Sequence, residues 1–259
     1  MSWIEALILG LVQGLTEFLP VSSSGHLELG KALFGVDFET GMGFTVAVHG
    51  ATVLSTLVVF RKQIASLVRG ALKFRWNDET RYIVLILLSM VPVGLAGLFF
   101  KDQIESLFSG NIVLVGSMLL VTASLLFLTH FFTDKGREIS FWRALLIGIA
   151  QAVAVIPGIS RSGATIATGM ILGISRSKVA EFSFLMVLLP VIGANVLEFS
   201  GFAGGPGSTT VFVVMIGFTA AFVAGLVACR VMIELVKSSR LWWFSVYCVV
   251  AGVAAILLG

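Results

Sequence analysis

The segment Pro20-Val21-Ser22-Ser23-Ser24-Gly25 interrupts an apolar run that covers residues 3–19. A second segment, Pro157-Gly158-Ile159-Ser160-Arg161-Ser162-Gly163, interrupts the apolar run 141–156 in the same way. After each segment the chain resumes as a short apolar stretch. Irregular backbone at membrane depth is tolerated only where protein or a water-filled cavity surrounds it. The pattern therefore predicts two re-entrant helical hairpins, with a first tip at 20–25 and a second tip at 157–163.

The composition around these tips is that of a membrane protein. Of the 259 residues, 58% are hydrophobic and only 12% are charged, whereas soluble domains carry about 25% charged residues. A soluble fold of this length cannot bury so much apolar surface, so the bilayer must cover the rest. The net charge of +3 does not indicate a nucleic-acid partner, because the basic residues cluster beside apolar spans. The oligomeric state stays open.

Six further segments have the length that a spanning helix needs, about 20 mostly apolar residues. They are 42–60, 81–100, 111–133, 178–199, 211–233 and 241–258. We therefore predict an all-α polytopic membrane protein with six transmembrane helices and two re-entrant helical hairpins. Basic residues concentrate in the loops after the first, third and fifth spans, which the positive-inside rule places in the cytoplasm, with both termini outside.

The two tips belong to an internal repeat. The 138-residue shift that takes Gln13 to Gln151 also aligns the tips without a gap. It pairs Ser22 with Ser160, Ser24 with Ser162 and Gly25 with Gly163. Each half has three spans, an odd number, so the second half must insert upside down as an inverted-topology repeat. We expect one membrane domain, 1–259, with repeat one at about 1–138 and repeat two at about 139–259, whose tips meet near the midplane.

The repeats differ in their reactive residues. The shift pairs Glu17 with Val155, Ser23 with Arg161 and His26 with Ala164. Ionisable residues inside a membrane are costly and therefore mark functional sites. We predict Glu17, Ser23, His26 and Arg161 as catalytic residues.

The same segments have the chemistry of a phosphate site. Serine-rich turns that start a helix present backbone N–H groups to anions, and a guanidinium grips two phosphate oxygens. Gln13 and Glu17 share a helix face and are predicted to hold a divalent cation, Mg²⁺ or alternatively Ca²⁺. Serines in membrane helices also bond to backbone, and His49 serves packing as readily as binding. The predicted substrate-binding residues are Ser22, Ser24, Gly25, His49, Ser160, Ser162, Gly163 and Thr165.

The stretches Gln13–His26 and Pro157–Thr165 resemble the two signatures of the undecaprenyl-diphosphate phosphatase family, also called the bacitracin-resistance protein family. The resemblance covers essentially the whole chain. It implies a bacterial inner-membrane enzyme that is dependent on a divalent cation and has its site open to the outer face. Such an enzyme removes the terminal phosphate of a polyprenyl diphosphate, which recycles the carrier for peptidoglycan synthesis and confers bacitracin resistance.

By motif match, the resemblance assigns function to Glu17, Ser23, His26, Ser160, Arg161 and Thr165. Gln13 occupies a position that is Glu in some members of the family and Gln in others.

Two alternatives remain at this point. A lipid-phosphate transporter or flippase would also use an inverted repeat with broken helices. Three species, Ser23, His26 or a metal-activated water, could attack phosphorus, and we favour Ser23 with His26 as its base.

Overall fold

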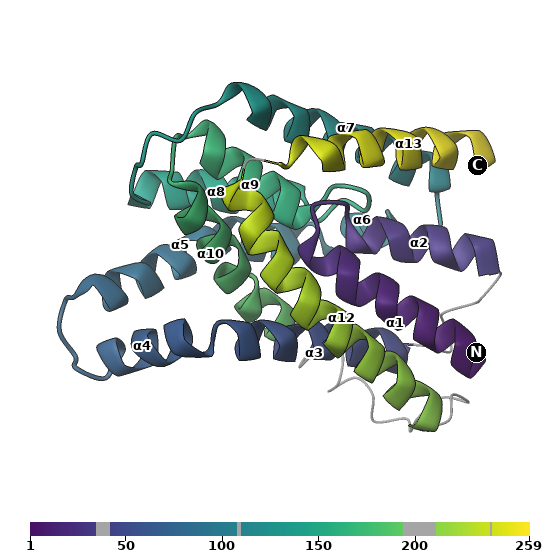
Figure 1. The fold of residues 1–259 in the computed structure, drawn as a ribbon, viewed down its shortest axis with the longest axis horizontal. Helices are drawn as coiled ribbons and strands as arrows, with labels where there is room; N and C mark the ends of the chain where they lie inside the picture. Colours follow the sequence, from purple (N-terminus) through teal and green to yellow (C-terminus); the bar gives the residue numbers. More distant parts are fainter. Residues whose placement is uncertain (35–41, 108–109, 194–210, 239) are drawn as a thin grey trace.

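The computed structural model describes residues 1–34, 42–107, 110–193, 211–238 and 240–259 (Figure 1). Within these ranges the regular structure is helical, apart from one isolated bridge between Arg137 and Ile174. The helices are α1 (Trp3–Phe18), α2 (Ser23–Phe34), α3 (Met42–Val59), α4 (Arg61–Ala71), α5 (Asp78–Phe99), α6 (Lys101–Ser106), α7 (Ile112–Leu128), η2 (Thr129–Phe131), α8 (Phe141–Val153), α9 (Arg161–Ile171), α10 (Arg176–Met186), α12 (Val211–Lys237) and α13 (Trp242–Leu258).

Helix length and hydropathy identify the protein as a polytopic membrane protein. Within the described residues, three helices are long and apolar enough to cross a membrane: α5, α7 continued through η2, and α12. The bent pair α3 and α4, with an angle of 76° between its two parts, raises the number to four. The expected span 178–199 starts in α10, which ends at Met186, and residues 194–199 lie outside the described ranges. The full number of six spans therefore stays a prediction.

The first helix of each hairpin begins at a serine cap. Ser2 Oγ accepts a hydrogen bond from Glu5 N, 3.2 Å away, and Ser140 Oγ accepts one from Arg143 N, 3.4 Å away. Such a cap satisfies one of the amides that a helix start leaves unpaired. Ser2 and Ser140 are related by the same 138-residue shift as the two tips, so the equivalent helices α1 and α8 begin at equivalent positions.

The two interrupted segments form helix pairs whose tips touch. α1 contacts α2, and α8 contacts α9. In Figure 1, α1 and α2 lie side by side and extend from their tip toward the end of the molecule that holds both chain termini. At the tips, Ser162 Oγ donates a hydrogen bond to Leu19 O, 3.2 Å away. A Cβ added to Gly25 would lie 3.1 Å from the Cα of Gly158, so the two tips meet backbone to backbone.

Each hairpin packs against a long helix from the other half of the chain. α1 contacts α12, and α8 contacts α5. Gly10 and Gly148, which are 138 residues apart, make the closest approaches. A Cβ on Gly10 would lie 2.3 Å from Gly217 O, and one on Gly148 would lie 2.2 Å from Ser89 O. Small residues allow such close packing of membrane helices, and it holds the two tips at a defined position.

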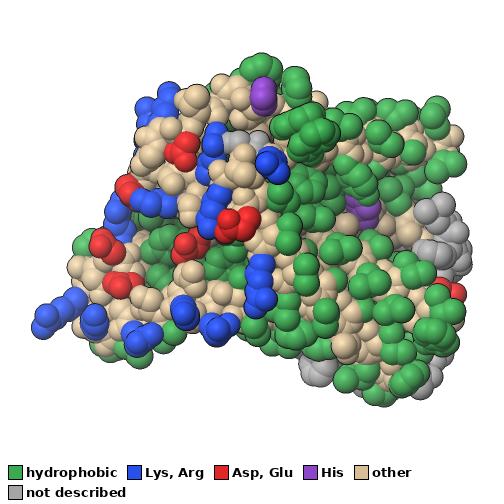
Figure 2. All heavy atoms as spheres, viewed as in Figure 1, with side chains coloured by type: hydrophobic (Ala, Val, Ile, Leu, Met, Phe, Trp, Pro, Cys, Tyr) green, Lys and Arg blue, Asp and Glu red, His purple; other side chains and the backbone are tan. Residues whose placement is uncertain are grey.

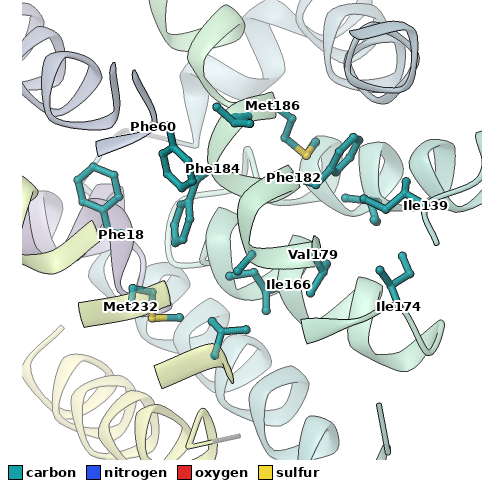
Figure 3. Packing of buried hydrophobic residues seen from close by; sticks show 14 of the residues in the cluster. Phe18, Phe60, Ile139, Ile166, Ile174, Val179, Phe182, Phe184, Met186 and Met232 are labelled. Carbon is teal, nitrogen blue, oxygen red and sulfur yellow. The ribbon is translucent and has the colours of Figure 1, made fainter. Parts of the chain in front are cut away.

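A buried aromatic cluster orients the end of α1 (Figure 3). The ring centroid of Phe184, in α10, lies 5.9 Å from that of Phe18 and 6.1 Å from that of Phe60. All three side chains are at most 2% exposed. Because Glu17 precedes Phe18 in the last turn of α1, this cluster also determines where the Glu17 side chain can lie.

The surface separates into an apolar and a charged part (Figure 2). Charged side chains gather over the end of the molecule where α4 and α5 project, and hydrophobic side chains cover much of the remaining visible face. Leu98 and Val250 are 73% and 65% exposed, as expected for side chains that contact lipid. The charged end carries the basic segments from which we predict the cytoplasmic side.

Candidate active site

Serine caps shape both tips in the same way. Ser22 Oγ accepts a hydrogen bond from Gly25 N at 3.3 Å, and Ser160 Oγ accepts one from Gly163 N at 3.1 Å. These two serines stand immediately before α2 and α9. The positive ends of both helix dipoles therefore point toward the region where the tips meet, an arrangement that favours an anion.

The second tip is held by α7. Thr122 Oγ1 donates a hydrogen bond to Gly158 O at 3.0 Å and accepts one from Ser160 N at 2.9 Å. Gly158 has a φ of 96°, and a Cβ there would lie 2.5 Å from Val115 O, so this position requires glycine. Ser22, in the first tip, also has a positive φ, 69°, which costs about 1–3 kcal/mol for a residue other than glycine. Such strain is typical of functional turns.

Both tips line one cavity of about 340 Å³, which also contacts α3, α5 and residues 187–191, which follow α10. It is the place where the two halves of the predicted site come together. The predicted site residues that line it are Glu17, Ser22, Ser23, Ser24, His49, Ser160, Arg161 and Ser162.

Glu17 and Arg161 form an ion pair between the two hairpins. Glu17 Oε1 lies 2.5 Å from Arg161 Nη2, and the two side chains are 9% and 22% exposed. The other carboxylate oxygen, Oε2, accepts hydrogen bonds from Ser23 Oγ at 2.8 Å and from Gln13 Nε2 at 3.0 Å. A carboxylate, a hydroxyl and a guanidinium thus form one connected cluster at the cavity wall.

His26 lies apart from this cluster. Its Nδ1 is 2.8 Å from Ser22 O, and because a carbonyl only accepts, Nδ1 must carry a proton. In the neutral ring Nε2 then accepts a hydrogen bond from the hydroxyl of Tyr247, 2.7 Å away. The two rings are also stacked, with centroids 5.6 Å apart. Both ring nitrogens of His26 therefore have hydrogen-bonding partners. Ser23 Oγ donates its hydrogen bond to Glu17.

Of the remaining predicted binding residues, Gly25, Gly163 and Thr165 support the tips and are not among the residues that line the cavity. Gly25 and Gly163 receive the serine caps. Thr165 Oγ1 donates to Arg161 O at 2.9 Å and lies 2.6 Å from Ser183 Oγ, which joins α9 to α10. His49 does line the cavity, and its Nδ1 lies 2.9 Å from Thr45 O.

Three residues that the sequence analysis did not assign to the site also lie there. Thr122 holds the second tip, Tyr247 holds His26, and Gln151 lines the cavity. Thr122 and Tyr247 belong to apolar helices without a motif, so nothing in the sequence distinguished them. Gln151 was visible as the repeat counterpart of Gln13, but its role depends on what surrounds it.

The ligand atoms available beside Glu17 are oxygens, which a hard cation prefers, and there are few of them. Among the described residues, no three His, Cys, Asp or Glu side chains gather in a way that could hold a metal. Glu17 offers a carboxylate, and Gln13 Oε1 is a buried amide oxygen without a partner in the described part of the chain. Mg²⁺ is often bound by one or two carboxylates while water and substrate phosphates supply the other ligands. The residues therefore fit a cation that arrives with a phosphate ligand.

Comparison with known proteins gives matches over the full length of the chain. The model of the family described as bacitracin resistance protein BacA matches residues 6–254. The chain is 50% identical over 261 residues to the undecaprenyl-diphosphatase of Bacteroides thetaiotaomicron, with 99% of each chain covered. It is 51% identical to the proteins of the same name from Parabacteroides distasonis and Christiangramia forsetii, with 99% of this chain and 98% of theirs covered.

Proposed function

The chain belongs to the bacitracin resistance protein family BacA, and we propose on this basis that it is an undecaprenyl-diphosphatase. It hydrolyses undecaprenyl diphosphate to the monophosphate and inorganic phosphate. The reaction returns the lipid carrier for peptidoglycan synthesis and provides resistance to bacitracin. The observation that carries this function to the described residues is the cluster of Glu17, Ser23 and Arg161 at the wall of a cavity between two helix N-termini.

In the proposed first step, Ser23 Oγ attacks the terminal phosphorus of the diphosphate. The proton of the hydroxyl passes to Glu17 Oε2, which already accepts it as a hydrogen bond. The bond between the terminal phosphorus and the bridging oxygen breaks, and undecaprenyl monophosphate leaves after its freed oxygen takes the proton from Glu17, which restores the carboxylate. Arg161 and the N-termini of α2 and α9 stabilise the negative charge on the transferred phosphoryl group.

A water molecule then attacks the phosphoserine, with Glu17 as its proton acceptor. The phosphorus–oxygen bond to Ser23 breaks, inorganic phosphate leaves, and Glu17 passes the proton of the water to Ser23 Oγ, which restores the hydroxyl. Phosphate oxygens compete with Glu17 for Arg161, so substrate binding frees the carboxylate from its cationic partner. The oxygen that Arg161 leaves, Oε1, is then open to a divalent cation, while Oε2 stays on Ser23 Oγ.

His26 holds the first tip in this scheme. Its ring joins Ser22, the residue before the nucleophile, to Tyr247 on α13. Direct attack by His26 Nε2 would first require this nitrogen to give up its hydrogen bond with Tyr247. Direct attack by water would leave Ser23 as a hydrogen-bonding residue only. Labelling of the protein by the terminal phosphate distinguishes both of these routes from attack by Ser23.

A divalent cation is part of the proposal. Glu17, with the Gln13 amide, would hold it, and when bound it would neutralise charge on the diphosphate.

We also propose the finer topology: six spans, two re-entrant hairpins and an inverted repeat, with the site open to the outer face. Equivalent caps at Ser2 and Ser140, and the reciprocal packing of α1 on α12 and of α8 on α5, support the repeat. The cavity is lined by Thr45, in the first turns of α3, whereas the basic segment follows the far end of that helix. Thr45 therefore lies about 20 Å along the helix from the charged end, on the side of the chain termini.

A lipid-phosphate flippase is the second candidate, because broken helices that meet between two halves are typical of transporters. The pairing of Ser23 with a carboxylate favours hydrolysis, since binding and release of a phosphate headgroup need no activated hydroxyl.

The test is phosphate release by the purified protein in detergent, with undecaprenyl diphosphate and Mg²⁺. We expect turnover that a chelator abolishes and that Ser23→Ala reduces strongly. The control is Ser66→Ala, a substitution on the exposed face of α4, which should turn over normally. Transport of the lipid in vesicles without any phosphate release would support the flippase instead.

A further inference from the structure

Gln151 is a deeply buried polar side chain at the cavity, and the reaction above does not use its amide group. It is 2% exposed, and it lines the cavity together with Ser160 and Arg161. Neither its Oε1 nor its Nε2 has a hydrogen-bonding partner within the described part of the chain. Most buried polar groups in proteins are paired, so an amide with two unpaired atoms beside a binding cavity points to a ligand.

Comparison with the other repeat shows why the amide lacks a partner. Gln13, its counterpart in the first hairpin, donates from Nε2 to Glu17, one helical turn later. The position one turn after Gln151 is Val155, which also lines the cavity and has no polar atom in its side chain. The equivalent amide is therefore occupied in the first hairpin and available in the second.

The surroundings of Gln151 decide which ligand group it can meet. Ala144, Ile147, Gly148 and Gln151 form the buried stripe of α8, and Gly148 brings this helix into contact with α5. Gln151 therefore lies where the packed stripe opens into the cavity, on the same hairpin as Arg161. The proposed substrate presents only acceptor oxygens at its diphosphate, and the amide NH₂ is a two-proton donor.

We propose that Gln151 binds the diphosphate by donating hydrogen bonds from Nε2 to its oxygens, as a second anion-binding group on the hairpin that carries Arg161. This role rests on the proposed phosphatase function. The second repeat then supplies a neutral donor, Gln151, beside the cationic Arg161, while the first repeat supplies the carboxylate and the hydroxyl.

The first test is Gln151→Met, which keeps a similar volume and removes both hydrogen-bonding atoms. We expect kcat/KM for undecaprenyl diphosphate to fall roughly 10- to 100-fold, the effect of losing a hydrogen bond to a charged group. The Tm should stay the same or rise, because the substitution removes buried polar atoms without partners. The matched control is Ile149→Met, at a 45% exposed position of the same helix, which should leave kcat/KM unchanged. An unchanged kcat/KM in Gln151→Met, or a loss that follows a fallen Tm, would overturn the proposal.

The second test is Gln151→Glu, which keeps an oxygen and replaces the donor with a negative charge. If the amide donates to phosphate, this variant should lose more activity than Gln151→Met. Activity equal to or above that of the unaltered protein would mean that the amide oxygen binds a cation, and the proposal would be wrong.

A binding measurement separates this inference from the proposed function. Inorganic pyrophosphate should raise the Tm of the unaltered protein, and it should raise that of Gln151→Met less. If pyrophosphate raises the Tm while undecaprenyl diphosphate yields no phosphate, the phosphatase function is wrong. A smaller Tm shift in Gln151→Met than in the unaltered protein would then still support Gln151 as a phosphate-binding residue. Equal shifts in both proteins would exclude Gln151 as a phosphate-binding residue.

Discussion

Glu17 Oε1 and Arg161 Nη2 lie 2.5 Å apart, although 144 residues separate the two side chains along the chain. One stands in the last turn of α1 and the other in the first turn of α9, so the pair joins the tips of two hairpins. An ion pair taken out of water often contributes little net stability, because desolvation offsets the attraction. The position of this pair at the cavity, with Ser23 bound to the same carboxylate, therefore indicates a role in the chemistry.

The first prediction concerns the geometry of Arg161. Arg161→Lys keeps the positive charge and loses the planar fork that can contact two phosphate oxygens. We expect kcat to fall by about 100-fold or more, as when a transition-state donor is removed. The measurement is phosphate release under saturating substrate. Arg61→Lys, at the exposed start of α4, is the control and should be unaffected. Normal turnover in Arg161→Lys would mean that only a diffuse positive field is needed.

The second prediction concerns Glu17 as the proton acceptor. Glu17→Gln keeps the shape of the side chain and removes its basicity, so turnover should fall by about 1,000-fold or more, within the range of general-base effects. The protein should still accumulate in the membrane. Glu234→Gln, in an exposed ion pair with Lys237, is the control and should retain activity. If Glu17→Gln does not accumulate, the ion pair with Arg161 is structural.

The third prediction identifies the nucleophile. Substrate labelled in its terminal phosphate should leave label on the protein when turnover is stopped with acid, because phosphoserine survives acid. The label should be absent in Ser23→Ala. Acid-labile, alkali-stable label that disappears in His26→Ala would make His26 the nucleophile. No label under any quench, together with an active Ser23→Ala, would favour attack by water.

The fourth prediction concerns the contact between His26 and Tyr247. Tyr247→Phe removes the hydroxyl that lies 2.7 Å from His26 Nε2 and keeps the stacked ring. The loss of one neutral hydrogen bond should reduce kcat/KM by roughly 2- to 10-fold. His26→Ala should cost more, because it also releases Ser22 O. If Tyr247→Phe loses as much activity as His26→Ala, the tyrosine hydroxyl takes part in the reaction itself.

The fifth prediction concerns topology. A cysteine at Ser2 should react with a membrane-impermeant thiol reagent in intact cells, and one at Ser66 should react only after permeabilisation. Both positions are exposed, and the native cysteines Cys229 and Cys248 are buried, so the background should be low. The opposite labelling pattern would reverse the orientation and contradict the outward opening of the site.

Much of the fold was predictable because it follows from local patterns. The interruptions after residues 19 and 156 are visible in the sequence, and the structure has helix breaks at both. Helix ends were less predictable. The expected span 178–199 is interrupted after Met186, where α10 ends. The span expected at 42–60 is confirmed as α3, which ends at Val59, and the chain then turns by 76° into α4. Hydropathy measures composition along the chain, and it does not respond to a change of helix direction.

The sequence by itself determined that this chain is a membrane protein with two related polar tips, because composition and the 138-residue repeat are properties of residue order alone. It also predicted Glu17, His26 and Arg161 as catalytic residues, because ionisable side chains inside a membrane are costly, and Ser23 with them. Only the tertiary structure decided which groups meet. It places Ser23 on Glu17, His26 on Tyr247, and the unpaired amide of Gln151 at the cavity. These contacts depend on how closely helices distant in sequence approach each other, which glycines such as Gly10 and Gly148 allow. Local sequence patterns contain no information on the distances between such helices.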